Sequence, residues 1–368
     1  MSKIEGLTYK NSGVNYGDMD PFKIQCQEAA ALTRDNIKRL GIREISWSRG
    51  ESAYLLRFPA GIISHVDEGL GTKSLVADAM YAATGKSYFD VVSQDTIAMN
   101  VNDMITLQTL PVSLTMHLAV EDGNWFKDKD RVNDLITGWK NSCDLARCAW
   151  GGGETPTLKD IVVKDATVLS CSGVGFSKKL YIPKAKEGDS IIMFSSSGIH
   201  ANGLSQSRKI AQERLAHRYQ TLVTPTETFG ELLLKPTHIY VGVIEDLQKI
   251  GVDIHYCVNI TGHGWRKLMR LNKELTYRIT DLAPDLPIFP FIQKHAGVND
   301  REMYGNLNMG AGFAIYVSEK ETQKVIDHVN KSSYGFTAWY AGSIEKGEKQ
   351  VIIEPKNIIF KKNDLEVR

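Results

Sequence analysis

The chain has 368 residues, of which 42% are hydrophobic and 24% are charged, and its formal net charge is +1. This length suits two domains, and the near-neutral charge argues against nucleic acid as the main partner, because proteins that bind the phosphate backbone normally carry a basic excess. The five cysteines form no CxxC pair, so neither a zinc site nor a disulfide framework is indicated. Without a signal-peptide core or a membrane-length apolar run, we expect a cytoplasmic protein that does not bind membranes.

Strands and helices alternate through the first half of the chain. A helix is predicted with Asp20 as its cap and Pro21 at its first position, closing at Gly41. Helical spacing of apolar residues follows at 87–107 and 130–149. Strands are predicted at 52–58, 61–66, 112–120 and 167–176.

A second cycle begins near residue 180. Strands are predicted at 189–197, 252–260, 309–318, 334–344 and 350–355, and helices at 202–216, 236–251 and from 262. We place the domain boundary near residue 178, which gives domains of 1–178 and 179–368. Since both halves alternate strands and helices, the fold class is α/β or α+β.

The loop HVDEGLGTKS, residues 65–74, combines acids with glycines and a lysine. Carboxylates and phosphates become compatible when Mg²⁺ lies between them. The glycines Gly69 and Gly71 let backbone N–H groups approach phosphate oxygens, and Lys73 can offset the remaining charge. The same composition also suits a plain strand-to-helix turn, and the loop does not match the Walker pattern GxxxxGK[ST].

Further acids follow along the chain. Asp95 and Asp103 are eight residues apart on one predicted helix, close to two turns, so they lie roughly on one side of it, with Asn102 beside Asp103. Three glycines then precede Glu154 in a predicted flexible loop, WGGGETPT, which suits close backbone approach to a ligand. Each of these features also has a plain interpretation, as a solvated helix face or a permissive loop.

Eight segments resemble the phosphoribosylformylglycinamidine cyclo-ligase family, also called aminoimidazole ribonucleotide synthetase. In order they are LTYKNSGVN, DEGLGTK, DTIAMNVNDMI, GGGETPT, SSSGIHANGLSQSRKI, LLLKPTHIYV, NITGHGW and MYGNLNMGAGFAI. The resemblance runs from about Leu7 to Gly342. It implies an N-terminal ATP-binding domain whose strands form a β-barrel between the subunits of a homodimer, and a C-terminal α/β domain that binds substrate. Candidate barrel strands lie near 53–66 and 112–120.

The resemblance also implies the reaction. Formylglycinamidine ribonucleotide and ATP become aminoimidazole ribonucleotide, ADP and phosphate, through phosphorylation of the formamide oxygen. Phosphoryl transfer depends on alignment and charge neutralisation, which fits acids for Mg²⁺ and glycines for phosphate contacts.

Family positions imply roles for individual residues. The implied metal ligands are Asp67, Asp95, Asp103 and Glu154. The implied ATP contacts are Gly69, Gly71, Thr72, Lys73, Asp95, Asn102, Gly152, Gly153, Glu154 and Thr155. The implied substrate contacts are Ser197, Gly198, His200, Asn202, Gly203, Thr261, Gly262, Gly264 and Asn308. Catalytic candidates are Asp67, Lys73 and His200; His200 either moves a proton, donates to the phosphoryl group, or only caps its loop.

Several positions depart from the family pattern. The family loop DGxGTK has one acid, and this chain has Asp67 followed by Glu68. Asn11 and Asn15 replace acids, QTLP at 108–111 replaces GAEP, and His263 replaces a glycine. Two alternatives therefore stay open: a related ATP-dependent small-molecule kinase, and a catalytically silent paralogue that acts as a binding subunit. The motifs SSGxHxNG, PTxIY and NxGxG favour the cyclo-ligase, and the retained acids and Lys73 argue against the silent paralogue.

Overall fold

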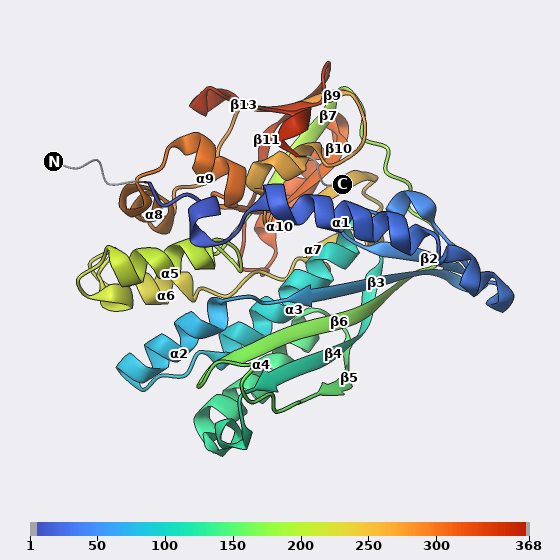
Figure 1. Cartoon of the computed structure of the whole chain (residues 1–368). Helices are drawn as coiled ribbons and strands as arrows, with labels where there is room; N and C mark the ends of the chain where they lie inside the picture. The colour runs from blue at the N-terminus through green and yellow to red at the C-terminus, as the bar shows by residue number, and fades with distance from the viewer. Residues whose placement is uncertain (1–5, 366–368) are drawn as a thin grey trace.

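The computed structural model describes residues 6–365, which form two mixed β-sheets flanked by helices (Figure 1). The mixed α/β class expected from the sequence is confirmed. In the described residues no helix is both long enough and apolar enough to cross a membrane.

The first sheet has six strands in the order β1-β2-β3-β6-β4-β5, antiparallel except for the β4–β5 pair. Its strands are β1 (Arg43–Glu44), β2 (Tyr54–Phe58), β3 (Gly61–Gly69), β4 (Leu110–Val120), β5 (Ala149–Glu154) and β6 (Thr167–Ser177). Helices α3 (Phe89–Thr106) and α4 (Lys129–Leu145) cover one face, and α2 (Lys73–Thr84) follows β3 (Figure 1). A Cβ at Gly173 of β6 would collide with side chains that include Met104 of α3, so this close approach requires the small residue.

The second sheet has seven strands in the order β13-β12-β9-β11-β7-β10-β8, with only β12 and β9 parallel. Its strands are β7 (Asp189–Ser195), β8 (Ile254–Asn259), β9 (Leu275–Ile279), β10 (Ala311–Ser318), β11 (Ala338–Lys346), β12 (Gln350–Ile353) and β13 (Ile358–Lys361). The helices of this half are α5 (Leu204–Glu213), α6 (Phe229–Leu233), α7 (Val241–Lys249), α8 (Ile288–Ala296), α9 (Asp300–Asn306) and α10 (Thr322–Lys331).

Both halves share one hydrophobic core. Ile192 and Phe194 of β7 point into a cluster that also contains Val101 of α3, whereas Ile191 and Met193 point into a second cluster on the opposite side of the sheet. Because β7 is buried on both faces, it is a continuous apolar run instead of an alternating one. The two sheets are therefore packed as one body around the junction.

The N-terminal segment, residues 6–31, lies against the second half of the chain. The Leu7 N–H donates to the Ala296 carbonyl at 2.7 Å, and the Gly203 N–H donates to Tyr9 Oη at 3.0 Å. Figure 1 shows the helix of this segment, α1 (Tyr16–Ala31), crossing the middle of the molecule. Sequence order alone thus does not decide which half these residues contact.

Three local expectations were wrong. Helix α1 begins at Tyr16, because the Asn15 side chain accepts the Gly17 N–H as an N-cap, so Pro21 lies inside the helix. The helix ends at Ala31, and a separate 3₁₀ helix, Arg34–Leu40, precedes Gly41. Residues 149–154, expected as a flexible loop, pair with β4 as an edge strand. The helix expected from residue 262 is a 3₁₀ helix over Gly264–Met269.

Candidate active site

A pocket of about 350 Å³ opens where α1, the end of β3, α3 and the 261–263 turn meet. Charged side chains and implied substrate contacts gather there from both halves of the chain. The charged lining residues are Lys23, Glu68, Asp103, Lys267 and Arg270, and the implied substrate contacts among the lining residues are Asn202, Thr261 and Gly262.

Glu68 and Asp67 point to opposite faces of β3. Glu68 lies on the helix-covered side and lines the pocket, while Asp67 is exposed on the other side. Burial, and then the neighbouring Asp103 carboxylate, raise the pKa of Glu68 to about 8. Counted back from Gly-Thr-Lys, EGLGTK has the length of DGxGTK, so Glu68 holds the position of the motif's acid. This count was the signal in the sequence that pointed to Glu68.

Helix α3 presents polar side chains to the second half. Asn259 Nδ2 donates to Asp103 Oδ1 at 2.8 Å. Asn102 Nδ2 donates to the His238 carbonyl at 2.8 Å, and Asn102 Oδ1 accepts the Tyr240 N–H at 2.9 Å. These contacts hold the end of α3 against β8 and the segment before α7, with Asp103 in the pocket wall.

Lys73 and Asp95 form an ion pair at 2.6 Å, and both side chains are 0% exposed. Lys73 Nζ also donates to the carbonyls of His200 at 3.1 Å and Lys235 at 2.8 Å, while Asp95 Oδ1 accepts the Thr237 N–H at 2.7 Å. The pair therefore joins the two halves beneath the 197–203 loop. Neither residue lines the pocket, and their implied contacts with nucleotide and metal stay predictions.

The 197–203 loop follows β7 and leads into α5. His200 has a left-handed φ of 59° and is 3% exposed, and its Nε2 lies 3.2 Å from the Ser197 N–H, which donates to it. Burial, His238 and Lys73 lower the pKa of His200 well below its usual value, so its ring is neutral. Asn308 Nδ2 donates to the Gly198 carbonyl at 2.9 Å. In this loop Asn202 lines the pocket, whereas His200 lies behind it.

The 261–264 turn adopts two left-handed residues in succession. Gly264 has φ 50°, and a Cβ there would collide with the Tyr304 carbonyl, so glycine is required. His263, with φ 67°, has the conformation that glycine tolerates best. Its ring stacks on Tyr16 with centroids 3.7 Å apart, and its Nε2 lies 3.3 Å from Asp20 Oδ2. These contacts hold α1 over the pocket.

Lys267 lies at the base of the pocket and is 9% exposed. Its Nζ donates to the Asn259 carbonyl at 3.2 Å and to Thr261 Oγ1. Burial lowers its pKa to about 8. The signal in the sequence for this residue is the group of basic residues 266, 267 and 270 that follows the TGHG turn directly. Tyr16 had no comparable signal.

Other implied site residues lie on the outer face of the first sheet, the face away from α3 and α4. Glu154 pairs in register with His117, His117 with Ser170, and Ser170 with Gly69. Three interstrand steps of about 4.8 Å thus separate β5 from β3 by about 14 Å. The exposed residues of this group are Asp67, Gly69, Gly71, Gly152, Gly153, Glu154 and Thr155, and Thr72 is half-buried beside them.

No three His, Cys, Asp or Glu side chains within residues 6–365 are grouped so that they could hold a metal ion. Asp67, Asp95, Asp103 and Glu154 are thus not gathered into one cluster within this chain. Glu68 and Asp103 do face the same pocket. Two carboxylates fit Mg²⁺, which commonly takes one or two carboxylates and completes its shell with water and substrate phosphates.

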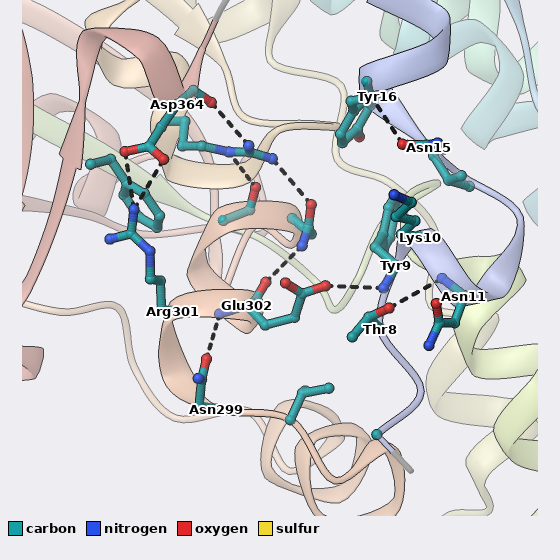
Figure 2. A pocket seen from close by; sticks show the side chains of 18 of the residues that line it. Thr8, Tyr9, Lys10, Asn11, Asn15, Tyr16, Asn299, Arg301, Glu302 and Asp364 are labelled. Carbon is teal, nitrogen blue, oxygen red and sulfur yellow. Dashed lines mark hydrogen bonds and ion pairs between the residues drawn. The ribbon is translucent and has the colours of Figure 1, made fainter.

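A larger pocket of about 700 Å³ is lined by the N-terminal segment and by residues 297–306, and Figure 2 shows Tyr9 beside Glu302 there. Tyr9 and Tyr16 line both pockets, so this segment is the wall between them. The Tyr9 N–H donates to Glu302 Oε1 at 3.0 Å, and Arg301 pairs with Asp364 at 3.0 Å.

Both halves of the chain match described families. Residues 50–176 match "AIR synthase related protein, N-terminal domain", and residues 186–354 match the corresponding C-terminal domain. Among solved structures, the chain is similar to a HypE–HypF complex at TM-score 0.59 and 16% identity, over 84% of this chain and 92% of that chain. Thiamine monophosphate kinase from Aquifex aeolicus gives TM-score 0.55 and 18% identity, over 89% of this chain and 97% of that chain. At these identities the structures show a common fold.

Curated relatives are closer in sequence. The protein named phosphoribosylformylglycinamidine cyclo-ligase from Methanococcus maripaludis is 33% identical over 342 residues, 92% of each chain. Its namesake from Methanocaldococcus jannaschii is 33% identical over 344 residues, again 92% of each chain. The chain therefore belongs to the phosphoribosylformylglycinamidine cyclo-ligase family.

Proposed function

We propose that this protein is the ATP-dependent cyclo-ligase of purine biosynthesis that converts formylglycinamidine ribonucleotide to aminoimidazole ribonucleotide. The observation that carries the proposal is the pocket in which Glu68 and Asp103, from the first half, face Asn202, Thr261 and Gly262, from the second. Homologues that span 92% of the chain have the name of this enzyme.

The reaction has two steps. The formamide oxygen attacks the γ-phosphorus of ATP, an O–P bond forms, and the bond to the bridging oxygen breaks to release ADP. The amidine nitrogen then attacks the formamide carbon that bears the phosphorylated oxygen. The new C–N bond closes the ring as the C–O bond breaks, and phosphate and a proton are released. Such chemistry depends on positioned charges, because the protein forms no covalent bond with the substrate.

ATP and Mg²⁺ are part of the proposal. The similar AaThiL and HypE structures were determined with AMPPCP and TMP, and with ATP, respectively. Glu68 and Asp103 would hold Mg²⁺, which would neutralise phosphate charge when bound. Asp67, Asp95 and Glu154 remain candidates from the family motifs. We keep the division at residue 178 and a cytoplasmic location, where the five free cysteines would stay reduced.

We also propose a homodimer that covers the outer face of the first sheet. Val168 and Val174 of β6 are 52% and 39% exposed there, beside exposed Asp67. A second sheet against this face would remove exposed apolar area, and it would also bring the outer-face residues, including Glu154, next to a partner. Within one chain, Glu154 of β5 lies three strands away from β3, the strand whose Glu68 lines the pocket.

Two alternatives are less favoured. The small-molecule kinases share the fold at 16–18% identity, whereas the named cyclo-ligases reach 33%. A silent binding subunit would have no reason to retain the pocket carboxylates.

Product analysis tests the proposal. The purified protein, incubated with Mg²⁺–ATP and formylglycinamidine ribonucleotide, should release ADP and phosphate with equimolar aminoimidazole ribonucleotide. Thiamine monophosphate in place of this substrate should give no phosphorylated product. ADP release only with thiamine monophosphate would identify a kinase, and nucleotide binding without turnover of either compound would identify a silent paralogue.

A further inference from the structure

The pocket contains a buried cation for which the family resemblance assigned no role. Lys267 is 9% exposed, and its ammonium is held by two neutral acceptors, the Asn259 carbonyl and Thr261 Oγ1. Within residues 6–365, no carboxylate lies within the 4.0 Å of Lys267 Nζ that would make an ion pair. An ammonium has three N–H donors, so one donor is left for a ligand.

The charges around the pocket favour an anionic ligand. Three cations line it, Lys23, Lys267 and Arg270, against two carboxylates, Glu68 and Asp103. Arg270 is already engaged, because it donates to Ser52 Oγ at 2.9 Å and to the Gly50 carbonyl at 2.7 Å. Lys23 is at the rim, where its side chain is 43% exposed and lies 3.8 Å from Asp20. Arg270 Nε also lies 3.8 Å from Glu51 Oε2. Among the described lining residues, Lys267 is thus the buried cation that has no carboxylate within 4.0 Å.

Burying an ammonium without a carboxylate in direct contact is unfavourable for folding. The Asp103 and Glu68 carboxylates across the pocket offset this only in part, since burial still lowers the pKa of Lys267 to about 8. A buried cation of this kind is typical of a binding site, where the folded protein is less stable than it could be because the side chain serves to bind a ligand. The two neutral acceptors, the Asn259 carbonyl and Thr261 Oγ1, orient the ammonium of Lys267. A phosphate oxygen is a ligand that meets both the charge and the hydrogen-bonding requirement.

We propose that Lys267 binds a phosphate group of the substrates in this pocket. This inference rests on the proposed function, because that reaction brings ATP and a phosphoribosyl compound to the same site. Thr261 and Asn259 act as positioning residues, since they touch Lys267 and fix the direction of its ammonium. Lys267 keeps its proton throughout, so its part is electrostatic.

Binding measurements test this without depending on turnover. Titration calorimetry with ADP and, separately, ribose 5-phosphate compares the full-length protein with Lys267→Met, which keeps the chain length and removes the charge. We expect at least about tenfold weaker binding of one of the two phosphates, in line with loss of a charge-assisted hydrogen bond. Weaker ADP binding assigns Lys267 to the nucleotide, and weaker ribose 5-phosphate binding assigns it to the phosphoribosyl group.

Lys273→Met is the matched control, because Lys273 also donates to a backbone carbonyl, that of Ala185 at 3.0 Å, but is exposed and outside the pocket. The melting temperature separates binding from structure: Lys267→Met should be as stable as the parent or more stable, while Thr261→Val should weaken the same ligand by less. Unchanged binding of both phosphates, or a lowered melting temperature with unchanged binding, overturns the assignment. If the parent protein makes no product while Lys267→Met still loses phosphate binding, the proposed function fails and this inference stands.

Discussion

The two faces of the first sheet differ in what covers them. On the inner face, α3 packs on the strands and its polar residues reach into the second half, so that Asp95 and Lys73 are completely buried. On the outer face, Asp67 and Val168 are exposed in this chain. The inner face is therefore completed by intramolecular contacts, whereas the outer face is open in one chain and is the face on which we propose a second molecule packs. Residues from one short motif, 67–73, are divided between the two.

The largest expected effect concerns the buried ion pair. Lys73→Met leaves the Asp95 carboxylate buried without its cation, which should lower the free energy of unfolding by about 3–5 kcal/mol. The control is Lys140→Met, whose ion pair with Asp144 has side chains 66% and 64% exposed and should contribute about 0.5 kcal/mol or less. Urea unfolding followed by circular dichroism measures both changes.

The double variant Lys73→Met/Asp95→Asn should recover part of the loss, because asparagine keeps an acceptor for the Thr237 N–H without a buried charge. If Lys73→Met is as stable as the control but loses turnover, Lys73 contacts the phosphates instead, as the family motif implied.

The second test compares neighbours on opposite faces of β3. Glu68→Gln keeps the shape of the side chain but cannot become a carboxylate ligand for Mg²⁺, so kcat/KM should fall about 10²–10³-fold. Asp67→Asn makes the same change on the outer face, and we expect a smaller loss. Steady-state ADP release at saturating Mg²⁺ measures both. A larger loss of kcat/KM in Asp67→Asn than in Glu68→Gln would assign the essential carboxylate to the outer face.

The outer face itself is tested by placing a charge on it. Val168→Asp would put a carboxylate into the proposed interface, so the dimer should dissociate to monomers at micromolar concentration, with loss of activity. Val163→Asp is the control, since Val163 is 75% exposed in the loop before β6. Light scattering after size-exclusion chromatography gives the mass. A parent protein that is monomeric and fully active would exclude the dimer.

His200 gives a smaller effect. Because its ring is buried and its Nε2 accepts the Ser197 N–H, we expect His200→Asn to lower the melting temperature by a few degrees, with a loss of kcat below about tenfold. Asparagine tolerates the left-handed backbone at this position. A larger fall in kcat with an unchanged melting temperature would instead assign proton transfer to His200.

The smallest effect is a pH dependence of stability caused by His238, which lies where α3 meets the second half. Burial lowers the pKa of His238 to about 4, below the usual histidine value near 6.5. Between these values the unfolded chain binds a proton that the folded chain does not, so stability should fall as the pH drops from about 6.5 to about 4. In His238→Phe, the fall in melting temperature between about pH 6.5 and about pH 4 should be smaller than in the parent by about 2–4 °C. Exposed His217, changed to Phe, should not alter it.

The sequence by itself determined the alternation of strands and helices, most of the strands, and the family, because apolar periodicity and the motifs are local properties. It also placed Asp95 and Asp103 on one side of a helix, and the structure shows that this side of α3 meets the second half. Only the tertiary structure decided that Glu68 points inward and Asp67 outward, since two adjacent acids have no apolar contrast to mark the buried face. The pairing of Lys73 with Asp95, and the packing of Tyr16 on His263, were likewise decided there. Tyr16 and His263 are 247 residues apart, and no local pattern specifies contacts that form only when the two halves pack together.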